Sequence, residues 1–411
     1  MEDDGDPSAL SIEVARARVL DSLSTIVGSE RLPTREARGR VLAADIAAPM
    51  SVPRFRASAM DGYALRHAER DRVLTVVGRS LAGHPGDDRL EPGGCVRITT
   101  GARVPDEADT VVQQENVAIE GDRVRLLERP ERGLNVREVG SDSERGTTLL
   151  TRDTRLAAAE LALLAAHGIV EVDVRRTLRL GLFSTGDELV EPGTTLGRGQ
   201  IHDANRALLH ALLDEPAIEI DDLGICPDSP RALDELMERS ASADLLVSSG
   251  GVSVGEADHV RAALEKRGHV SLWKIAMKPG RPLTFGTLED GRVFFGLPGN
   301  PVSAAITALM FVRPAIARLT GTPHEPLPPL DAKLAGALRK RPGRVEYQRG
   351  CLRVDESGKA SVTTTGLQDS HVLRSLQRAN CLIELPIASS GAEAGETVAV
   401  HPFRSFAHPP L

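Results

Sequence analysis

The sequence predicts a multidomain protein in which a central α/β domain with a mostly parallel sheet is accompanied by helical and small β domains. Between residues 177 and 321, short apolar runs typical of strands alternate with helical patterns, as in a parallel sheet with crossover helices. On both sides of this region the chain breaks into short β-rich pieces separated by Gly and Pro. At 411 residues the chain is also too long for a single hydrophobic core.

The predicted domain boundaries follow changes in this rhythm. Helical patterns at 11–26 and 154–167 flank a β-rich stretch, which we interpret as an insertion into a helical domain. The proline cluster TPHEPLPPL is typical of a linker. We therefore expect a discontinuous helical domain of residues 1–51 and 141–176, an inserted small β domain of residues 52–140, the α/β domain of residues 177–321, and a C-terminal small β-barrel-like domain of residues 322–411.

Individual elements are predicted from the period of their apolar residues. In the inserted domain we expect strands at 73–77, 96–99, 110–113 and 124–127, preceded by a strand over 40–49. In the α/β domain, strands at 178–183, 218–224 and 245–248 are each followed by a helix, at 205–213, 230–240 and 256–266. Extended runs near 270–276, 282–287 and 292–296 lead to a long helix from Pro301, which Pro314 should kink because proline lacks an N–H group. A helical turn near 372–377 is expected among the C-terminal strands.

Composition excludes several classes of function. The net charge of −8, with 50 basic residues against 58 acidic ones, does not fit a nucleic-acid-binding protein. The four cysteines, Cys95, Cys226, Cys351 and Cys381, form no C-x-x-C pair and are interpreted as reduced thiols. The acidic start lacks the pattern of a signal peptide, and no apolar run approaches membrane-spanning length. We expect a soluble, cytoplasmic protein without a nucleic-acid or membrane partner.

The stretch DLLVSSGGVSVGEADHV at 244–260 predicts an anion-binding site. Its apolar start suits a buried strand, its serines and glycines suit a tight turn, and a helix begins near Glu256. Unpaired N–H groups and the helix dipole at such a turn favour negative charge. Asp258, in the first turn of the helix, would repel a bare anion unless a cation lay between them. The pattern therefore predicts a metal-bridged phosphate.

Three glycine-bearing loops follow predicted strands and are expected to line one crevice. Ligands bind open parallel sheets beyond the carboxyl ends of the strands, where this chain has STGDEL (184–189), SSGGVSVGEAD (248–258) and GLPGNPVS (296–303). The nearby turn KPGR adds the cations Lys278 and Arg281. The loop residues expected to bind substrate are Ser184, Thr185, Gly186, Ser249, Gly250, Gly251, Ser253, Gly255, Pro298, Gly299, Asn300 and Pro301.

Glu188 and Asp258 are the predicted Mg²⁺ ligands, with Asp228 as a third candidate. Mg²⁺ takes one or two carboxylates and completes its shell with water and phosphate. Simpler interpretations stay open for these features. Glu188 also suits a turn beside a helix cap, and Asp228 suits the cap of the helix that starts at Pro230. The stretch 299–301 also suits a plain helix start, and the cations of KPGR suit a solvated surface loop.

A serine hydrolase is the competing hypothesis. The stretch GVSVG at 251–255 matches the G-x-S-x-G nucleophile elbow between a strand and a helix. Asp290 or Asp331, with His324 or His371, would complete the order of such a triad, but no pattern pairs a specific histidine with Ser253. The chain contains no P-loop, no H-E-x-x-H and no G-x-G-x-x-G motif.

Seven motifs follow one another along nearly the whole chain: SAMDGYA (58–64), RITTGARVPDEADTVVQQE (97–115), STGDEL (184–189), SSGGVSVGEAD (248–258), WKIAMKPGRPLTFG (273–286), GLPGNPVSAA (296–305) and GLQDSHVLRSLQRANCLIELP (366–386). In this order they resemble the molybdopterin molybdenumtransferase family, which includes bacterial MoeA proteins and the E domain of gephyrin. The resemblance implies a MogA/MoaB-like α/β domain. It also implies insertion of molybdate into the dithiolene of adenylylated molybdopterin, with Mg²⁺-dependent release of AMP.

The resemblance also implies roles for particular residues. Catalytic roles fall to Asp61, Thr100, Glu188, Asp228 and Asp258, the last three as metal ligands. Contacts with molybdate or phosphate fall to Lys274, Lys278, Arg281, Ser303, Arg344 and Ser370. It further implies an elongated homodimer in which Asp61 and Thr100 reach the site of the other subunit, and contact with the adenylyltransferase of the same pathway.

Some positions depart from the family pattern. His259 stands where relatives often have Tyr, Arg281 replaces the second Lys of the KPGKP pattern, and residues 140–142 read Gly-Ser-Asp instead of Gly-Glu-Asp. None of these changes removes a predicted metal ligand, but they leave open a specialised paralogue, for example one that favours tungstate. A scaffold protein on the same fold, as in gephyrin, is the second class of hypothesis. A scaffold need not keep every carboxylate, and this chain keeps them all, which favours an enzyme.

Overall fold

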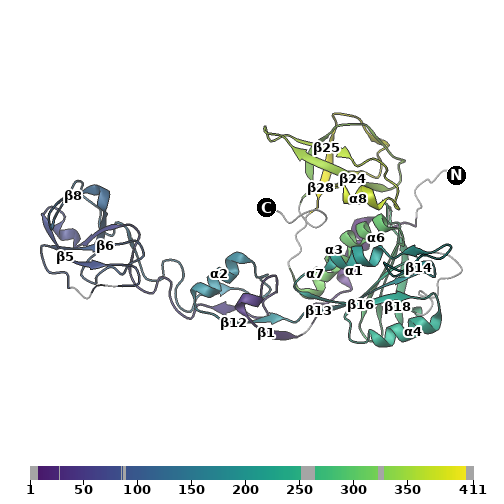
Figure 1. The fold of residues 1–411 in the computed structure, drawn as a ribbon, viewed down its shortest axis with the longest axis horizontal. Coiled ribbons are helices and arrows are strands. Elements are labelled where there is room, and N and C mark those ends of the chain that lie inside the picture. Colours follow the sequence, from purple (N-terminus) through teal and green to yellow (C-terminus); the bar gives the residue numbers. More distant parts are fainter. Residues whose placement is uncertain are drawn as a thin grey trace. The chain divides into compact units, whose positions relative to one another are not determined.

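The computed structural model describes residues 8–26, 28–84, 86, 89–250, 264–322 and 328–403. The chain divides into two compact units, whose elements are labelled in Figure 1. Unit 1 comprises Met1–Glu30, Gly39–Val41 and Val174–Leu411, and unit 2 comprises Arg31–Arg38 and Leu42–Asp173. The finer division into four domains stays a prediction.

A six-stranded sheet forms the centre of the α/β part of unit 1 (Figure 1). Its order is β16 (Ile218–Cys226), β13 (Leu178–Thr185), β17 (Leu245–Ser249), β21 (Val293–Leu297), β20 (Pro282–Leu288) and β18 (Gly268–Lys274). The first four strands run parallel, whereas β20 and β18 pair in antiparallel fashion. This confirms the predicted mostly parallel sheet. Its central strands are apolar because helices cover both faces.

Helices on the two faces enclose two separate cores. The larger core lies on the face covered by α1 (Ile12–Asp21), α3 (Asn205–Leu213), α6 (Pro301–Thr307) and α7 (Arg313–Thr320). On the other face, α4 (Pro230–Arg239) packs Leu233, Leu236 and Met237 into a core with Phe183 and Phe294. The helix predicted at 256–266 lies largely outside the described residues.

The first helix belongs to unit 1, whereas α2 (Ala158–Ala166) belongs to unit 2. Ile12, Ala15 and Val19 of α1 are buried in the larger core of unit 1. The helix ends at Asp21, earlier than predicted, because the Ser22 hydroxyl donates to the Val19 carbonyl at 2.7 Å and caps it. The two helices of the predicted helical domain therefore fall into different compact units. The strand predicted over 40–49 is reduced to β2 (Ile46–Ala47).

α6, a π-helical turn (Ala308–Val312) and α7 follow one another without a break through the core. The π-helical turn lies directly before Pro314, whose ring and missing N–H group disturb a regular helix. The kink predicted at Pro314 thus takes the form of a π-helical turn. In contrast to the expectation from the sequence, Pro301–Thr320 is long and apolar enough to cross a membrane, but 78% of its apolar window is buried inside the protein, as in the core helix of a globular domain.

A closed five-stranded barrel forms the C-terminal part of unit 1 (Figure 1) and confirms the predicted barrel-like domain. The circle runs through β24 (Val345–Val354), β25 (Ala360–Thr364), β22 (Leu330–Leu334), β28 (Thr397–Pro402) and β26 (Cys381–Leu385), which pairs again with β24. The predicted helical turn is α8 (Leu373–Gln377). From the α/β part, β19 (Met277–Lys278) joins the barrel by pairing in parallel with β24. Smaller pairs in unit 1 are β23 (Leu338–Arg339) with β27 (Gly391–Ala392) and β14 (Leu189–Val190) with β15 (Ile201–His202).

A second six-stranded sheet dominates unit 2 and matches the predicted small β domain in its strand positions. Its order is β7 (Thr110–Gln113), β4 (Gly62–Leu65), β6 (Gly94–Ile98), β5 (Leu74–Ser80), β9 (Arg123–Leu126) and β8 (Val117–Glu120). Smaller strand pairs join β10 (Val136–Arg137) to β3 (Ala57–Ser58), β11 (Thr148–Leu150) to β2, and β1 (Ser29–Pro33) to β12 (Glu171–Arg175). Single 3₁₀ turns occur at Thr34–Glu36, His67–Glu69 and Gln114–Asn116.

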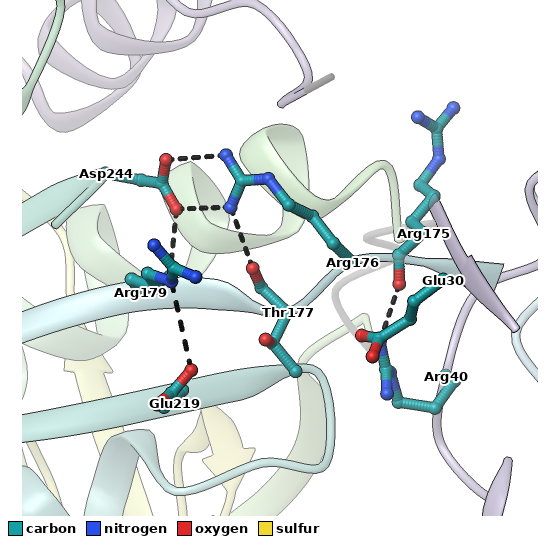
Figure 2. Close-up of polar contacts among 8 residues, drawn as sticks. All are labelled: Glu30, Arg40, Arg175, Arg176, Thr177, Arg179, Glu219 and Asp244. Carbon is teal, nitrogen blue, oxygen red and sulfur yellow. Dashed lines mark hydrogen bonds and ion pairs between the residues drawn. The ribbon is translucent and has the colours of Figure 1, made fainter. Parts of the chain in front are cut away.

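Two arginines fix the start of β13 within unit 1 (Figure 2). Arg176 donates from both Nη atoms to the Asp244 carboxylate at 2.7 Å, which ties the amino ends of β13 and β17 together. Arg40 is only 6% exposed and donates to Glu30 at 2.5 Å and to the Arg175 carbonyl at 2.6 Å. These contacts lie at the amino ends of the strands. The site is predicted at the other end of the sheet, beyond the carboxyl ends.

Candidate functional site

A pocket of about 980 Å³ opens at the carboxyl ends of the parallel strands of unit 1. At the carboxyl ends of β13, β17 and β21, Ser184 pairs in register with Ser249, and Ser249 pairs with Leu297. The loops that follow these strands therefore begin side by side and form the floor of the pocket. The predicted site residues that line it are Thr185, Gly186, Glu188, Asp228, Ser249, Gly250, Lys278, Arg281, Pro298, Gly299, Asn300, Pro301, Ser303, Arg344 and Ser370.

The remaining predicted residues are not placed in this pocket. Ser184 is fully buried at the end of β13, and Lys274, the last residue of β18, does not line the pocket. Asp61 and Thr100 belong to unit 2. Gly251, Ser253, Gly255 and Asp258 lie outside the described residues, so their roles stay predictions. Ser253 as a hydrolase nucleophile stays untested with them, although Asp290 precedes β21, at the opposite end of the sheet.

Gly250 brings two of the floor loops into contact. Its φ of +89° is a left-handed conformation that favours glycine, and a Cβ atom there would lie 2.5 Å from the Thr185 carbonyl oxygen. The Gly250 N–H group also donates to the Leu297 carbonyl at 3.0 Å. Glycine at position 250 is therefore required by the close approach of the loop that follows β13.

One end of the pocket is acidic. Glu188 follows β13 and Asp228 follows β16, and these strands are neighbours at one edge of the sheet. The Asp228 N–H group donates to the Asp187 carboxylate at 3.2 Å, which ties the two loops together. Ser229, and not Asp228, caps α4, since its hydroxyl accepts from the Ala232 N–H group at 3.2 Å. The simpler interpretation of Asp228 as a helix cap is therefore wrong.

The acidic end offers two carboxylates that fit a hard divalent cation, because Mg²⁺ binds through one or two carboxylates with water and phosphate as its other ligands. A Cβ atom at Gly186 would lie 2.6 Å from Oε2 of Glu188, so this glycine leaves room for the carboxylate beside its own loop. Within the described ranges, no group of three or more His, Cys, Asp or Glu side chains is arranged to hold a metal ion. A site built on Glu188 and Asp228 alone is what these residues offer.

The opposite end of the pocket is basic. Lys278 and Arg281 lie between β18 and β20, at the other edge of the sheet, and Arg344 comes from the barrel. Lys278 pairs in register with Glu346 of β24, and its Nζ lies 3.3 Å and 3.4 Å from the two carboxylate oxygens. The Glu346 side chain is only 7% exposed. The Lys278 side chain itself is 51% exposed, so it is a half-exposed cation paired with a buried carboxylate, and the surface-loop interpretation stays open.

The barrel supplies one wall of the pocket through residues 368–371, held from behind by Arg349. This arginine is 1% exposed and donates to the Ser375 hydroxyl at 3.0 Å and to the Asp369 carbonyl at 3.1 Å. Burial lowers the pKa of Arg349 to about 10, against the pull of Glu346. Sequence reasoning missed Arg349. Its signal was an arginine inside a strand whose flanking residues are apolar or neutral.

The start of α3 and the residues just before it contribute two further residues that sequence reasoning missed. Asn205, its first residue, donates from Nδ2 to the Ser249 hydroxyl at 2.8 Å and to the Gly299 carbonyl at 2.6 Å. Asp203 lines the pocket with its side chain buried, and it accepts the Arg206 N–H group at 3.1 Å. The signal for both was the polar run HDAN at 202–205, directly before the apolar part of the helix predicted at 205–213.

Within unit 2, Asp61 and Thr100 contact each other directly. Oδ1 of Asp61 accepts the Thr100 N–H group at 2.7 Å and the Thr100 hydroxyl at 2.9 Å. These two hydrogen bonds lower the pKa of Asp61, so its carboxylate is ionised at neutral pH. The resemblance had implied a role for both residues, and the structure brings them together.

Comparison with known proteins accounts for nearly the whole chain. The model of the MoeA N-terminal region (domain I and II) matches residues 10–168, a model described as "Probable molybdopterin binding domain" matches residues 181–318, and the model of the MoeA C-terminal region (domain IV) matches residues 331–403.

Individual relatives agree with these models. The molybdopterin molybdenumtransferase of Haemophilus influenzae is 42% identical over 399 residues, which cover 96% of this chain and 98% of that protein. The enzyme of the same name from a Nostoc species is 37% identical, with 89% and 86% covered. The crystal structure of a molybdopterin biosynthesis moeA protein from Pyrococcus horikoshii is similar with a TM-score of 0.80 at 29% identity, covering 96% of this chain and 100% of that one. The chain therefore belongs to the molybdopterin molybdenumtransferase family.

Proposed function

We propose that this chain is a molybdopterin molybdenumtransferase of molybdenum cofactor biosynthesis, which inserts molybdate into adenylylated molybdopterin and releases AMP. The observation that carries the proposal is the separation of charge within one pocket. Glu188 and Asp228 stand at one end, Lys278, Arg281 and Arg344 stand at the other, and a floor rich in glycine lies between them. Such a pocket suits a substrate that presents both a metal-bound pyrophosphate and a second oxyanion.

Each end of the pocket has its own part in the proposed reaction. Lys278, Arg281 and Arg344 would bind molybdate, a tetrahedral dianion, through charge-assisted hydrogen bonds. Glu188 and Asp228 would hold Mg²⁺, with Asp258 as a further predicted ligand; the ion neutralises charge on a pyrophosphate when bound. For the reaction, molybdate would have to move from the basic end to the phosphoanhydride. One of its oxygens would then bond to the AMP phosphorus while the bond from that phosphorus to the pterin phosphate oxygen breaks. The pterin phosphate is the leaving group, and AMP departs with the molybdate oxygen as molybdenum passes to the dithiolene sulfurs.

The proposal includes the other subunit of a homodimer. Asp61 and Thr100 of unit 2, already joined by two hydrogen bonds, would complete the pocket of the partner. The adenylylated substrate would come from an adenylyltransferase of the same pathway, acting with this protein in the cytoplasm. The preference between molybdate and tungstate is part of the same proposal and is tested by offering each oxyanion.

The experiment is an AMP-release assay with adenylylated molybdopterin, with and without molybdate and Mg²⁺. Glu188→Gln and Asp228→Asn should each lower Mg²⁺-dependent AMP release at least about 100-fold, because losing a ligand of a charge-stabilising metal costs several kcal/mol of transition-state stabilisation. Glu219→Gln, an exposed carboxylate on β16 away from the pocket, should release AMP like the unaltered protein. Full turnover by either pocket variant would refute the proposal.

A mixing experiment tests the shared site. Asp61→Asn and Glu188→Gln proteins are each expected to be inactive as homodimers. A mixed dimer of the two contains one intact site if Asp61 acts on the partner's pocket, so activity should return on mixing. Failure to regain activity in a verified mixed dimer would place Asp61 in the pocket of its own subunit.

A further inference from the structure

Asn205 joins two loops of the pocket floor through hydrogen bonds from its side-chain amide. As the first residue of α3 it lines the pocket, and its Nδ2 reaches both the Ser249 hydroxyl at 2.8 Å and the Gly299 carbonyl at 2.6 Å. Ser249 ends β17, and Gly299 precedes α6. A single amide group therefore links the loops that follow two neighbouring strands of the sheet.

The Gly299 carbonyl settles which way the Asn205 amide points. Oxygen and nitrogen of an asparagine side chain are distinguished by their hydrogen-bond partners, and a backbone carbonyl can only accept. The atom that faces Gly299 must therefore be the NH₂ group. The same NH₂ group faces the Ser249 hydroxyl, so one of its hydrogens goes to each partner.

This orientation determines what the Ser249 hydroxyl can do. Because its oxygen accepts from Asn205, its own hydrogen is left to donate elsewhere. Ser249 is 2% exposed and lines the pocket. In the part of the chain that the structure describes, no acceptor for this hydrogen is found. Ser184 pairs in register with Ser249, so the two side chains lie on the same face of the sheet. The Ser184 hydroxyl is buried and has no hydrogen-bond partner among the described residues.

We propose that Asn205 is a positioning residue that turns the Ser249 hydroxyl into a fixed hydrogen-bond donor to an acceptor atom of the substrate. The ligand atom is an oxygen or ring nitrogen that accepts, as both the phosphate and the pterin of the proposed substrate provide. The inference rests on the proposed function and adds to it a residue for which neither motif nor resemblance implied a role. An aligned donor in a buried floor binds more tightly than one that must first be turned from another partner.

Asn205→Asp tests the direction of this hydrogen bond. A carboxylate only accepts, so the Ser249 hydroxyl would donate to Asp and be lost to the substrate. The KM for the adenylylated pterin should rise about three- to tenfold, the usual effect of one neutral hydrogen bond, while kcat changes less than about twofold, because the bond is made in ground and transition states alike.

A double-mutant cycle separates positioning from mere support of the fold. Ser249→Ala should raise KM by a similar factor. Adding Asn205→Asp or Asn205→Ala to Ser249→Ala should raise KM no further, because the Ser249 hydroxyl through which Asn205 acts is already removed. The control is Asn380→Ala, which also removes two side-chain bonds to backbone, both to Leu352 in the barrel. It should lower stability and leave KM unchanged. Effects of Asn205 and Ser249 that multiply in full would overturn the inference.

Calorimetric binding of the adenylylated pterin, measured without turnover, distinguishes this inference from the proposed function. If the unaltered protein binds the compound but releases no AMP, the proposed function fails. The inference then still stands or falls on whether Asn205→Asp binds about three- to tenfold more weakly than the unaltered protein. If the unaltered protein does not bind the compound at all, both are wrong.

Discussion

Replacing Arg176 with methionine should destabilise unit 1 by leaving a half-buried carboxylate without its main partner (Figure 2). Both Nη atoms of Arg176 lie 2.7 Å from Asp244, which also accepts the Arg179 N–H group at 2.9 Å. Burial acts to raise the pKa of Asp244, but the hydrogen bonds from Arg176 and Arg179 outweigh it, so the pKa lies below its usual range. Methionine keeps most of the volume of the side chain but removes the charge together with the hydrogen bonds to Asp244 and to the Thr177 carbonyl.

The exposure of the two side chains sets the expected size of the effect. Arg176 is 32% exposed and Asp244 is 19% exposed, which places the pair between two well-studied limits. Breaking a surface ion pair costs about 0–1 kcal/mol, and removing one partner of a buried pair costs about 3–5 kcal/mol. We therefore expect unit 1 to lose about 2 kcal/mol. With a urea dependence of about 2 kcal/mol per M, the unfolding midpoint should fall by about 1 M.

Tryptophan fluorescence measures this loss in unit 1 alone. The chain has a single tryptophan, Trp273, which lies on β18 with its ring 5.5 Å from that of Phe285. Urea titrations should be run on the unaltered protein, on Arg176→Met, on Asp244→Asn and on the double variant. The double variant should be more stable than Arg176→Met, because it contains no uncompensated buried charge.

The pH dependence of the free energy of unfolding below pH 6 tests whether the Asp244 carboxylate causes the loss of stability in Arg176→Met. A carboxylate whose pKa is depressed by folding contributes stability above its unfolded pKa of about 3.9 and loses it as the pH falls through the folded value. The difference between the unaltered protein and Arg176→Met should therefore be full at pH 6 and shrink steadily toward pH 3. An unchanged midpoint, or a difference that does not vary with pH, would refute the reasoning.

Two further predictions concern the pocket. Gly250→Ala should lower the stability of unit 1 by at least about 2 kcal/mol, because φ is +89° and the new Cβ would lie 2.5 Å from the Thr185 carbonyl oxygen; a normal urea midpoint from Trp273 fluorescence would contradict this. Arg349→Met should reduce AMP release at least about tenfold with little change in that midpoint. Burial lowers the pKa of Arg349 to about 10, which corresponds to a cost of about 3 kcal/mol for its buried charge. This cost is fully present below pH 10. Removing the charge therefore offsets the loss of the hydrogen bonds of Arg349. Normal turnover of this variant would exclude Arg349 as the anchor of residues 368–371.

The floor of the pocket was predictable because its pattern is local. A strand followed at once by small and polar residues places a loop at a carboxyl end, and this held for Thr185, Ser249 and Gly299. Glycine at position 250 was also predictable, because it directly follows the strand in the sequence. The atom that leaves no room for a side chain there, the Thr185 carbonyl oxygen, is distant in sequence.

Contacts between distant segments were not predictable from one sequence. The apolar face of α1 shows that Ile12 and Val19 are buried, but not which element covers them; the structure places them in one core with residues of α7. Asp228 and Ser229 are both good helix caps, and only coordinates show which side chain accepts the N–H group. Arg349 acts on the pocket through a loop that folds back on its own strand, which no period in the sequence reveals.

The order of strands explains how one pocket keeps acidic and basic groups apart. Along the chain β16 and β13 come first and β18 and β20 come later, and in the sheet they occupy opposite edges, with β17 and β21 between them. Three strand spacings of roughly 4.8 Å each separate the loop of Glu188 from the turn of Arg281. At roughly 14 Å, opposite charges attract one another by about 1 kcal/mol or less, so neither end neutralises the other. A ligand that spans the floor, as a pyrophosphate and a molybdate would in the proposed reaction, therefore meets carboxylates at one end and, beside the Lys278–Glu346 pair, the guanidinium groups of Arg281 and Arg344 at the other.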